Sequence, residues 1–303
     1  MKFKNITPAD YHDLVRFFDG QKYRLCTYSL TSILAWSNQM YQPYGAIDGQ
    51  TLFIFIKFTR HEERNHLILP VSPGKEFAPE ELNYFAARQG IDKYCFVPES
   101  YIQYYGRERV EEHFEIADHE GFSDYVYRKE DLAELEGSKY SKKRNLIHQF
   151  DRSYFNRGRV AIGPITVENA QECVDFLEKW CEEQNCEADM EDDFACEKQA
   201  AKNTLENIGM LHVRGILARI DGEISAIGIG SHLTDGMGVL HFEKAFSNIK
   251  GLYQFFDREC ARRLFESYQY INKENDMNIP GLIHSKKSYF PAMIVKAYRL
   301  ILR

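Results

Sequence analysis

ILARIDGEISAIGIGSHLTDGMGVLHFEKAFSNIKGLYQFF, residues 216–256, is the stretch of sequence that decides the fold. Apolar runs the length of a strand alternate here with two turn signals, Asp221-Gly222 and Thr234-Asp235-Gly236. A run with helical spacing and another short apolar run follow them. The pattern predicts an antiparallel meander of three strands, then a helix, then a fourth strand. These elements are expected at residues 216–220, 224–231, 238–245, 252–265 and 268–272.

The loop before the predicted helix carries Asn248, Lys250 and Gly251, and the first turn of the helix holds Tyr253. A glycine lets the backbone approach a ligand closely, and the N-terminus of a helix favours an anion. We therefore expect Asn248, Lys250, Gly251 and Tyr253 to bind an anionic donor substrate. The alternative is a glycine that only caps the helix, beside a solvated lysine.

The first half of the chain repeats this order of elements. Ile47-Asp48-Gly49 separates two strand-like runs, as Ile220-Asp221-Gly222 does in the second half. The repeated order of five elements predicts two tandem copies of one fold, residues 1–135 and 136–303. Pro73 in the equivalent loop cannot donate an amide, so we expect the first copy to be a scaffold or acceptor side. The elements of the first copy are expected at residues 41–47, 51–58, 66–71, 79–90 and 93–97.

Length and charge limit the classes of function. A chain of 303 residues favours two cores, and a net charge of −7 argues against a general nucleic-acid binder. The charge is unevenly placed, because residues 139–159 carry seven Lys or Arg against one Asp. Residues 182–197 carry eight acids and no Lys or Arg, and we expect them to form a solvated loop.

Seven cysteines without CxxC pairs or close histidines predict reduced, packed thiols of a cytoplasmic protein. Residues 1–10 have no apolar signal core, and no run approaches 18 apolar residues. We therefore expect a chain that is neither secreted nor membrane-spanning. No metal-ligand spacing occurs, and no tightly bound cofactor is expected.

Four separated motifs carry a resemblance to a known family. They are KYSKKRN at residues 139–145, HFEKA at residues 241–245, KGLYQ at residues 250–254 and YINKEND at residues 270–276. In these the chain resembles the phosphatidylglycerol lysyltransferase C-terminal-domain family. The resemblance implies an α/β (α+β) protein of two tandem GNAT-like domains, each a mixed, mainly antiparallel sheet flanked by helices. It also implies a relation to the Fem-type aminoacyltransferases, which use aminoacyl-tRNA and have a basic helix between their domains.

The resemblance suggests catalytic residues. Glu243 lies late in the third strand, where GNAT enzymes often have a general base, and His241 shares its strand face. Tyr289 has a small residue four positions before it and is the candidate acid toward the leaving group. Asn272 closes the fourth strand and is a candidate for binding the acceptor. The alternatives are a salt bridge for Glu243, a buried ring for His241, a core tyrosine for Tyr289 and a polar turn at Asn272.

Lys139, Lys142, Lys143 and Arg144 form a basic cluster on a predicted helix between the copies. They suit the phosphates of tRNA or an anionic headgroup, and the alternative is a solvated inter-domain helix. The sequence favours transfer of an aminoacyl or acyl group from aminoacyl-tRNA or an acyl thioester to an amine or hydroxyl, by direct attack. The alternatives are an acyl-CoA N-acyltransferase, disfavoured by bulky Tyr253, and a non-catalytic tRNA- or anion-binding module.

Overall fold

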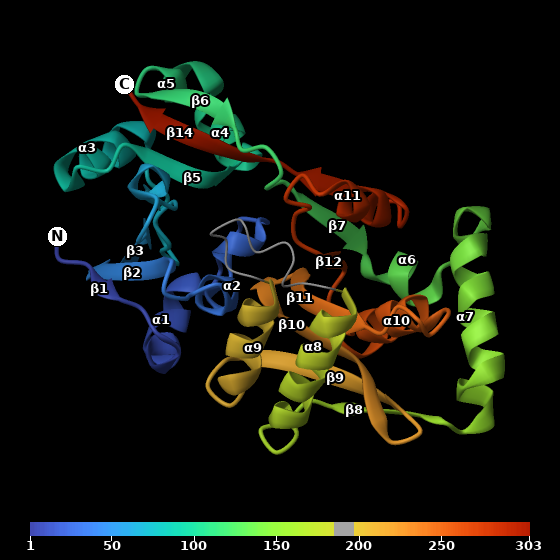
Figure 1. Cartoon of the computed structure of the whole chain (residues 1–303). Coiled ribbons are helices and arrows are strands. Elements are labelled where there is room, and N and C mark those ends of the chain that lie inside the picture. Colours follow the sequence, from blue (N-terminus) through green and yellow to red (C-terminus); the bar gives the residue numbers. More distant parts are fainter. Residues whose placement is uncertain (185–196) are drawn as a thin grey trace.

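The computed structural model describes residues 1–184 and 197–303 and contains two seven-stranded sheets (Figure 1). The first sheet consists, in spatial order, of β1 (Lys4–Asn5), β2 (Tyr41–Asp48), β3 (Thr51–Phe58), β4 (His66–Leu67), β5 (Lys93–Pro98), β14 (Ala297–Leu302) and β6 (Phe114–Asp118). The second consists of β13 (Met293–Val295), β7 (Asp124–Arg128), β12 (Tyr270–Asn272), β11 (Met237–Ala245), β10 (Glu223–Thr234), β9 (Val213–Ile220) and β8 (Val160–Pro164).

Both sheets are mixed and mainly antiparallel. In each of them one neighbouring pair is parallel, β4 with β5 in the first sheet and β11 with β12 in the second. The two sheets follow the same spatial plan, and helices flank both. The fold class expected from the sequence, two tandem GNAT-like domains, is therefore confirmed.

The predicted meander of the second half is confirmed, because β9, β10 and β11 pair antiparallel in chain order. Asp221 and Gly222 connect β9 to β10 with φ angles of 52° and 92°. Both central residues of the turn are thus left-handed, as a tight two-residue hairpin requires. Glycine adopts this conformation without cost and aspartate tolerates it, which explains why this dipeptide was a reliable signal.

Each sheet contains one strand from the other half of the chain. β7 lies between β12 and β13 in the second sheet, and β14 lies between β5 and β6 in the first. Both exchanged strands are paired on both sides. The division predicted between residues 135 and 136 is therefore crossed twice, because two strands complete the sheet of the opposite half.

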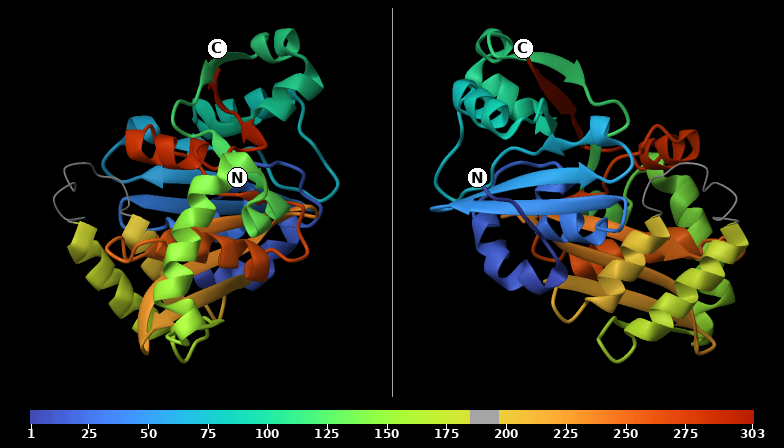
Figure 2. Two further views of the ribbon diagram at one scale, coloured as in Figure 1. Left: turned by 90° about the vertical axis from the view of Figure 1, so that its right-hand side faces the viewer. Right: turned by 60° about the vertical axis from the view of Figure 1, so that its left-hand side comes forward.

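Helices cover both faces of the second sheet (Figures 1 and 2). α7 and α10 pack together on one face, where the rings of Phe150 and Phe255 are 4.6 Å apart. α8 and α9 bury Leu177 and Ala201 on the other. The helices of the described residues are α1 (Tyr11–Leu14), α2 (Leu30–Ala35), α3 (Pro79–Gln89), α4 (Glu99–Tyr105), α5 (Arg107–Glu111), α6 (Lys129–Glu134), α7 (Ser141–Ser153), α8 (Ala170–Gln184), α9 (Glu197–Glu206), α10 (Leu252–Leu264) and α11 (Pro280–Lys287).

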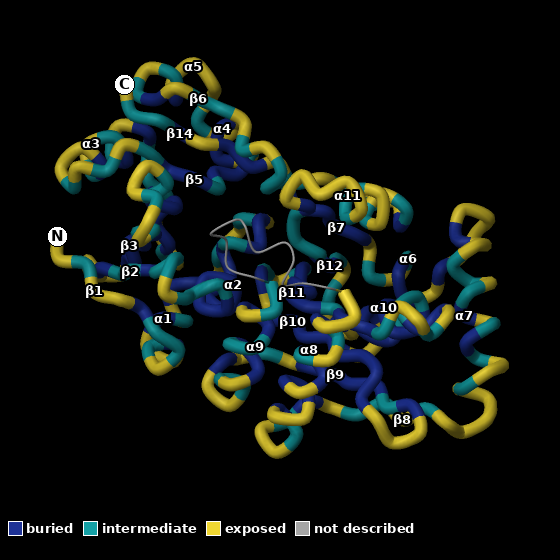
Figure 3. Tube along the Cα trace, in the orientation of Figure 1, coloured by how far each residue is buried: buried dark blue, intermediate teal, exposed yellow. Residues whose placement is uncertain are grey.

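Burial is deepest in the central strands of the second sheet, whereas α11 and much of α7 are exposed (Figure 3). Within residues 1–184 and 197–303, no helix is long and apolar enough to cross a membrane. Five of the seven cysteines are described, and all five are buried, as expected of packed residues. Cys186, Cys196 and most of the acidic segment at 182–197 lie outside the described residues.

Candidate active site on the second sheet

Four ionisable side chains meet on the face of the second sheet that α10 covers. Lys273 follows β12 and donates from Nζ to Glu243 Oε2 at 2.9 Å and to Asp257 Oδ1 at 2.6 Å. The side chains of these three residues are 16% exposed or less. Tyr289 completes the group, with its ring centre 5.4 Å from Lys273 Nζ. We call these four residues the carboxylate–lysine cluster.

The sheet itself brings the cluster together. Among the described residues, the last pair in the parallel ladder between β11 and β12 is Val239 with Asn272. Glu243 on β11 and Lys273 after β12 lie beyond this last pair, so their ion pair connects the two strands where the backbone ladder has ended. Gly228 lies opposite Glu243 on β10, and a side chain at 228 would collide with Cys260 of α10. Its absence lets α10 lie close to this part of the sheet.

Burial sets the protonation of the cluster. Burial, reinforced by the charge of Asp257, raises the pKa of Glu243 to about 7, although the ammonium of Lys273 opposes the shift. Burial alone would lower the pKa of Lys273, but Asp257 and Glu243 outweigh it and raise that pKa well above the ordinary value. Burial also raises the pKa of Tyr289, which stays a phenol. The cluster thus combines a carboxylate poised near neutrality, a fixed cation and a neutral proton donor.

Tyr289 is held from two directions. Its backbone carbonyl accepts a hydrogen bond of 3.0 Å from the buried hydroxyl of Tyr140. The ammonium of Lys143 on α7 lies 3.8 Å from the centre of its ring and also donates to Ser288 Oγ at 2.8 Å. Burial lowers the pKa of Lys143. The predicted acid therefore lies in the same cluster as the predicted base.

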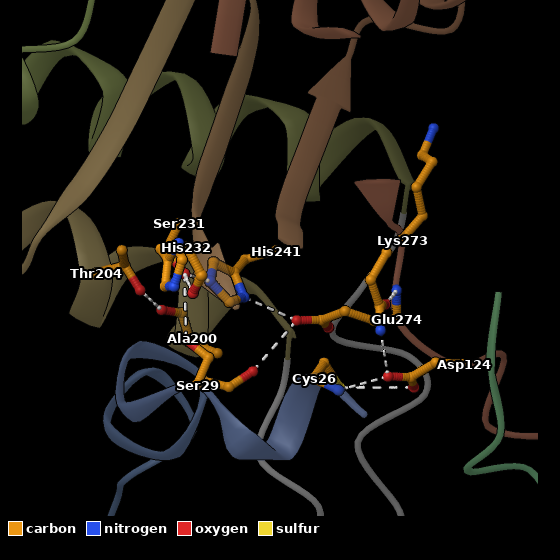
Figure 4. A network of polar contacts seen from close by, with 12 residues as sticks. Cys26, Ser29, Asp124, Ala200, Thr204, Ser231, His232, His241, Lys273 and Glu274 are labelled. Atoms are coloured by element: carbon orange, nitrogen blue, oxygen red, sulfur yellow. Dashed lines mark hydrogen bonds and ion pairs between the residues drawn. The ribbon is translucent and has the colours of Figure 1, made fainter. Parts of the chain in front are cut away.

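His241 belongs to a second, neighbouring network (Figure 4). Its Nδ1 is 2.9 Å from Glu274 Oε1, and its Nε2 is 2.7 Å from Ser231 Oγ, which is 3.1 Å from Ser29 Oγ. Glu274 has a left-handed φ of 57°, and in Figure 4 its carboxylate reaches His241 while the side chain of Lys273 extends away from it. The His241 side chain is 1% exposed. It fits the alternative of a buried hydrogen-bonded ring, and it connects the second sheet to the N-terminal half.

Asn272 is fully buried, and its carboxamide is satisfied by protein groups. It donates to Arg24 O at 2.8 Å and Asp124 Oδ2 at 2.7 Å, and it accepts from Glu274 N at 2.7 Å. The acceptor-binding role expected for Asn272 has no support in this geometry, because neither side-chain hydrogen is free to bind an acceptor. Asn272 instead fixes the backbone that carries Lys273 and Glu274.

The predicted donor loop is covered by a helix on one side. Gly251 has φ 84°, and a Cβ there would overlap the carbonyl oxygen of Leu146 on α7. Close packing of α7 explains this glycine without a ligand. Tyr253 is partly buried near the Ala245 backbone, whereas Asn248 and Lys250 are exposed. The loop residues therefore do not converge on one group in the structure.

Replacement of Gly251 by alanine should destabilise the protein strongly. The left-handed backbone costs about 1 kcal/mol in alanine, and the overlap with Leu146 adds about 1–3 kcal/mol. Gly158→Ala is the matched control, since Gly158 has φ 69° and open space around its Cβ position. Chemical denaturation should give a loss of about 2–4 kcal/mol at Gly251 and about 1 kcal/mol at Gly158. Equal losses at the two positions would contradict the close packing of α7.

The basic cluster is only partly free. Arg144 donates to the backbone carbonyls of Leu135 and Gly137, and Lys143 lies against Tyr289. Lys139 is 3.7 Å from Asp131 but half-exposed, and Lys142 is exposed. The structure thus divides the four residues into two that hold protein groups and two that face outward.

Sequence reasoning missed Asp257 and the role of Lys273. Asp257 is an acid on the buried side of α10, three residues before Cys260 and seven before Leu264. An acid on an apolar helix stripe was an available signal, because a buried carboxylate needs a cationic partner. Lys273 lies in a motif of the resemblance, but its partners come from a strand and a helix that only the fold places beside it.

Comparisons with known proteins support one family. A conserved protein of unknown function from Bacteroides thetaiotaomicron is 28% identical over 100% of both chains, with a TM-score of 0.88. The DUF2156 C-terminal domain of a protein assigned as a lysylphosphatidylglycerol synthetase from Agrobacterium fabrum is 13% identical, covers 97% of this chain and 93% of that one, and has a TM-score of 0.65. The search of curated proteins gave no match.

The second of these structures shows the shared fold. The family model also matches most of the chain. Fold and family together point to acyl transfer. A model described as "Phosphatidylglycerol lysyltransferase, C-terminal" matches residues 25–301, and the chain belongs to that family.

Proposed function

We propose that this protein transfers an aminoacyl group from an activated ester to a hydroxyl or amine acceptor, at the carboxylate–lysine cluster. The observation that carries the proposal is the meeting of Glu243, Lys273 and Tyr289 where β11 and β12 cease to pair. The name of the family suggests the class of acyl group, since its members are described as lysyltransferases.

The proposed reaction is a direct attack. The acceptor oxygen or nitrogen attacks the ester carbonyl and gives up its proton to the Glu243 carboxylate. The ammonium of Lys273 stabilises the negative charge that develops on the carbonyl oxygen. The bond to the leaving oxygen then breaks, and the phenol of Tyr289 supplies the proton for that oxygen. Asp257 touches none of the reacting atoms in this scheme and holds Lys273 in its charged form.

Two observations favour an aminoacyl ester over acyl-CoA. The loop that would hold a pyrophosphate is closed beside Gly251 by α7, and Tyr253 occupies the place of a small residue. Lys139 and Lys142 face outward on the segment that packs against the cluster through Lys143. Exposed cations beside a reactive centre suit the phosphates of a tRNA donor.

Ligand-induced stabilisation tests the choice of donor. The melting temperature would be measured with acetyl-CoA, uncharged tRNA and aminoacylated tRNA, at low and moderate salt. A ligand at a hundred times its dissociation constant adds about 2.7 kcal/mol to the free energy of unfolding. We expect a shift with aminoacylated tRNA that declines with salt, and a smaller one after Lys142→Ala. A shift with acetyl-CoA alone would make the protein an acyl-CoA N-acyltransferase, and a shift with both tRNA forms but no turnover would favour a binding module.

Activity should depend on pH through Glu243. As a base it must be ionised, so turnover should rise with pH around its pKa of about 7. The free energy of unfolding should have the opposite trend. The pKa of Glu243 in the folded protein lies above the ordinary value of 4.5. Its contribution to the free energy of unfolding is therefore complete below pH 4.5 and is lost as pH rises through about 7. Turnover and the free energy of unfolding, each measured from pH 4.5 to about 7, check the two opposite trends. A turnover rate that falls across this range would contradict the assignment of Glu243 as the base.

A further inference from the structure

A pocket of about 410 Å³ lies at the junction of the two halves, away from the carboxylate–lysine cluster. Its walls come from residues 22–24, from α4 and from residues 293–296, where the chain crosses from β13 into β14. Tyr23, Tyr104, Met293 and Val295 give it largely apolar walls. A volume of this size suits a small ligand with an apolar part and a few polar anchors.

Among the described charged residues that line the pocket, two cations are paired with carboxylates and one is not. Lys22 pairs with Glu76 at 2.5 Å, and Lys296 with Glu99 at 3.5 Å. Arg24 forms no ion pair among the described residues, and its Nη1 is only 3.6 Å from the sulfur of Met293. Its backbone is fixed, because Arg24 O accepts a hydrogen bond from Asn272. The pocket therefore presents a single surplus guanidinium, which matches a monoanion and in particular the two oxygens of a carboxylate.

One wall of the pocket is an open strand edge. β13 is the last strand of the second sheet and pairs only with β7. Tyr125 directs its backbone to β12, since its N–H donates to Glu274 O and its C=O accepts from Lys273 N, so the backbone groups of Asp124 and Val126 face β13. Met293 and Val295 pair with Val126 and Asp124, so their backbone groups point to β7. The N–H and C=O of Ile294 alternate to the other side and face outward at the pocket. An open edge of this kind adds an extended peptide by main-chain hydrogen bonds.

We propose that this pocket binds an extended ligand ending in a carboxylate, with the carboxylate on Arg24 and its amide groups on the edge of β13. The apolar walls receive the side chain next to the carboxylate. Both the C-terminus of a peptide and a free N-acylated amino acid have this chemistry. The proposal is independent of acyl transfer, since the residues that carry it are separate from the four of the cluster.

Calorimetric titration of the full chain tests the proposal with four probes: acetyl-Ala-Val-Leu as the free acid, the same peptide as its amide, acetyl-leucine and dimethyl phosphate. We expect the acid to bind about 10- to 100-fold tighter than the amide. Arg24→Gln should remove that difference, and Arg24→Lys should keep part of it because the charge remains without the fork. Lys287→Gln on α11 is the matched control and should leave binding unchanged, since Lys287 is exposed and outside the pocket.

The remaining outcomes are equally decisive. Tighter binding of the tripeptide than of acetyl-leucine supports a peptide terminus, and equal binding supports a free acylated amino acid. Dimethyl phosphate binding as tightly as acetyl-leucine would overturn the carboxylate assignment. Equal affinity for acid and amide, unchanged binding in Arg24→Gln, or no binding of any probe at millimolar concentration would overturn the site. Melting curves of both Arg24 variants verify that they fold, which the exposure of Arg24 leads us to expect.

Discussion

Glu243→Gln should lower the rate of acyl transfer by about 10²- to 10⁴-fold, the usual contribution of a positioned general base. Glutamine keeps the size of the side chain and can still accept a hydrogen bond from Lys273, but it cannot take the proton of the acceptor. The fold should survive, because the change removes a buried carboxyl whose pKa burial has already raised to about 7. Single-turnover transfer from lysyl-tRNA to phosphatidylglycerol vesicles, followed at saturating enzyme, measures the chemical step.

Glu223→Gln provides the control for this experiment. Glu223 begins β10 and is exposed, and it lies outside the carboxylate–lysine cluster. Its replacement should leave the rate within about twofold of the unmodified protein, as expected for a surface change away from the site. If Glu243→Gln transferred as fast as Glu223→Gln, Glu243 would not be the base, and a structural ion pair with Lys273 would be its remaining role.

Removal of residues 297–303 should abolish cooperative folding of the first sheet. β14 lies between β5 and β6, and it buries Tyr298 and Leu300 in the core of the first half. Without it β6 has no partner strand, and buried backbone groups on two strands lose their hydrogen bonds. The same exchange predicts that residues 1–135 and 136–303 fail to fold separately and fold when produced together.

Circular dichroism melts and hydrogen exchange would measure this effect. Removal of Arg303 alone is the matched control, since Arg303 is exposed and follows the last residue of β14. It should melt like the full chain, whereas in the chain lacking 297–303 the amides of the first sheet should lose their protection and no cooperative transition of that sheet should remain. A cooperative melt of residues 1–135 alone would contradict an obligatory exchange of strands.

Local sequence signals were sufficient to predict the elements of the two repeats, each with three strands, a helix and a fourth strand. Asp221-Gly222 defined a hairpin because its backbone conformation suits few residues, and the apolar runs around it gave the strands. The strand exchange was not predictable in this way. A short run such as Tyr125-Val126-Tyr127 is compatible with a strand, but it does not indicate which of two similar sheets receives that strand. The place of β14 in the first sheet could not be predicted for the same reason, since partner strands that are distant in sequence leave no local pattern.

The candidate site was predictable only in part. Glu243 and Tyr289 were expected to act together, and the structure places them in one cluster, although their roles remain predictions. The expectation for Gly251 rested on its backbone freedom, which the structure explains by the nearby carbonyl of Leu146. A single sequence does not distinguish a glycine that admits a ligand from one that admits a helix. The ion pair between Lys273 and Asp257 could not be predicted from the sequence, because only the packing of α10 on the sheet brings the two side chains together.

The central claim is that the chain catalyses acyl transfer from an aminoacyl ester. Its most direct test is the discharge of radiolabelled lysyl-tRNA, compared with that of radiolabelled acetyl-CoA, each incubated with the protein and phosphatidylglycerol vesicles above the pKa of Glu243. We predict that the label leaves lysyl-tRNA at least about 100-fold faster than in the Glu243→Gln protein and appears in the acceptor, while acetyl-CoA stays intact. Discharge of neither donor above the spontaneous rate would contradict the claim.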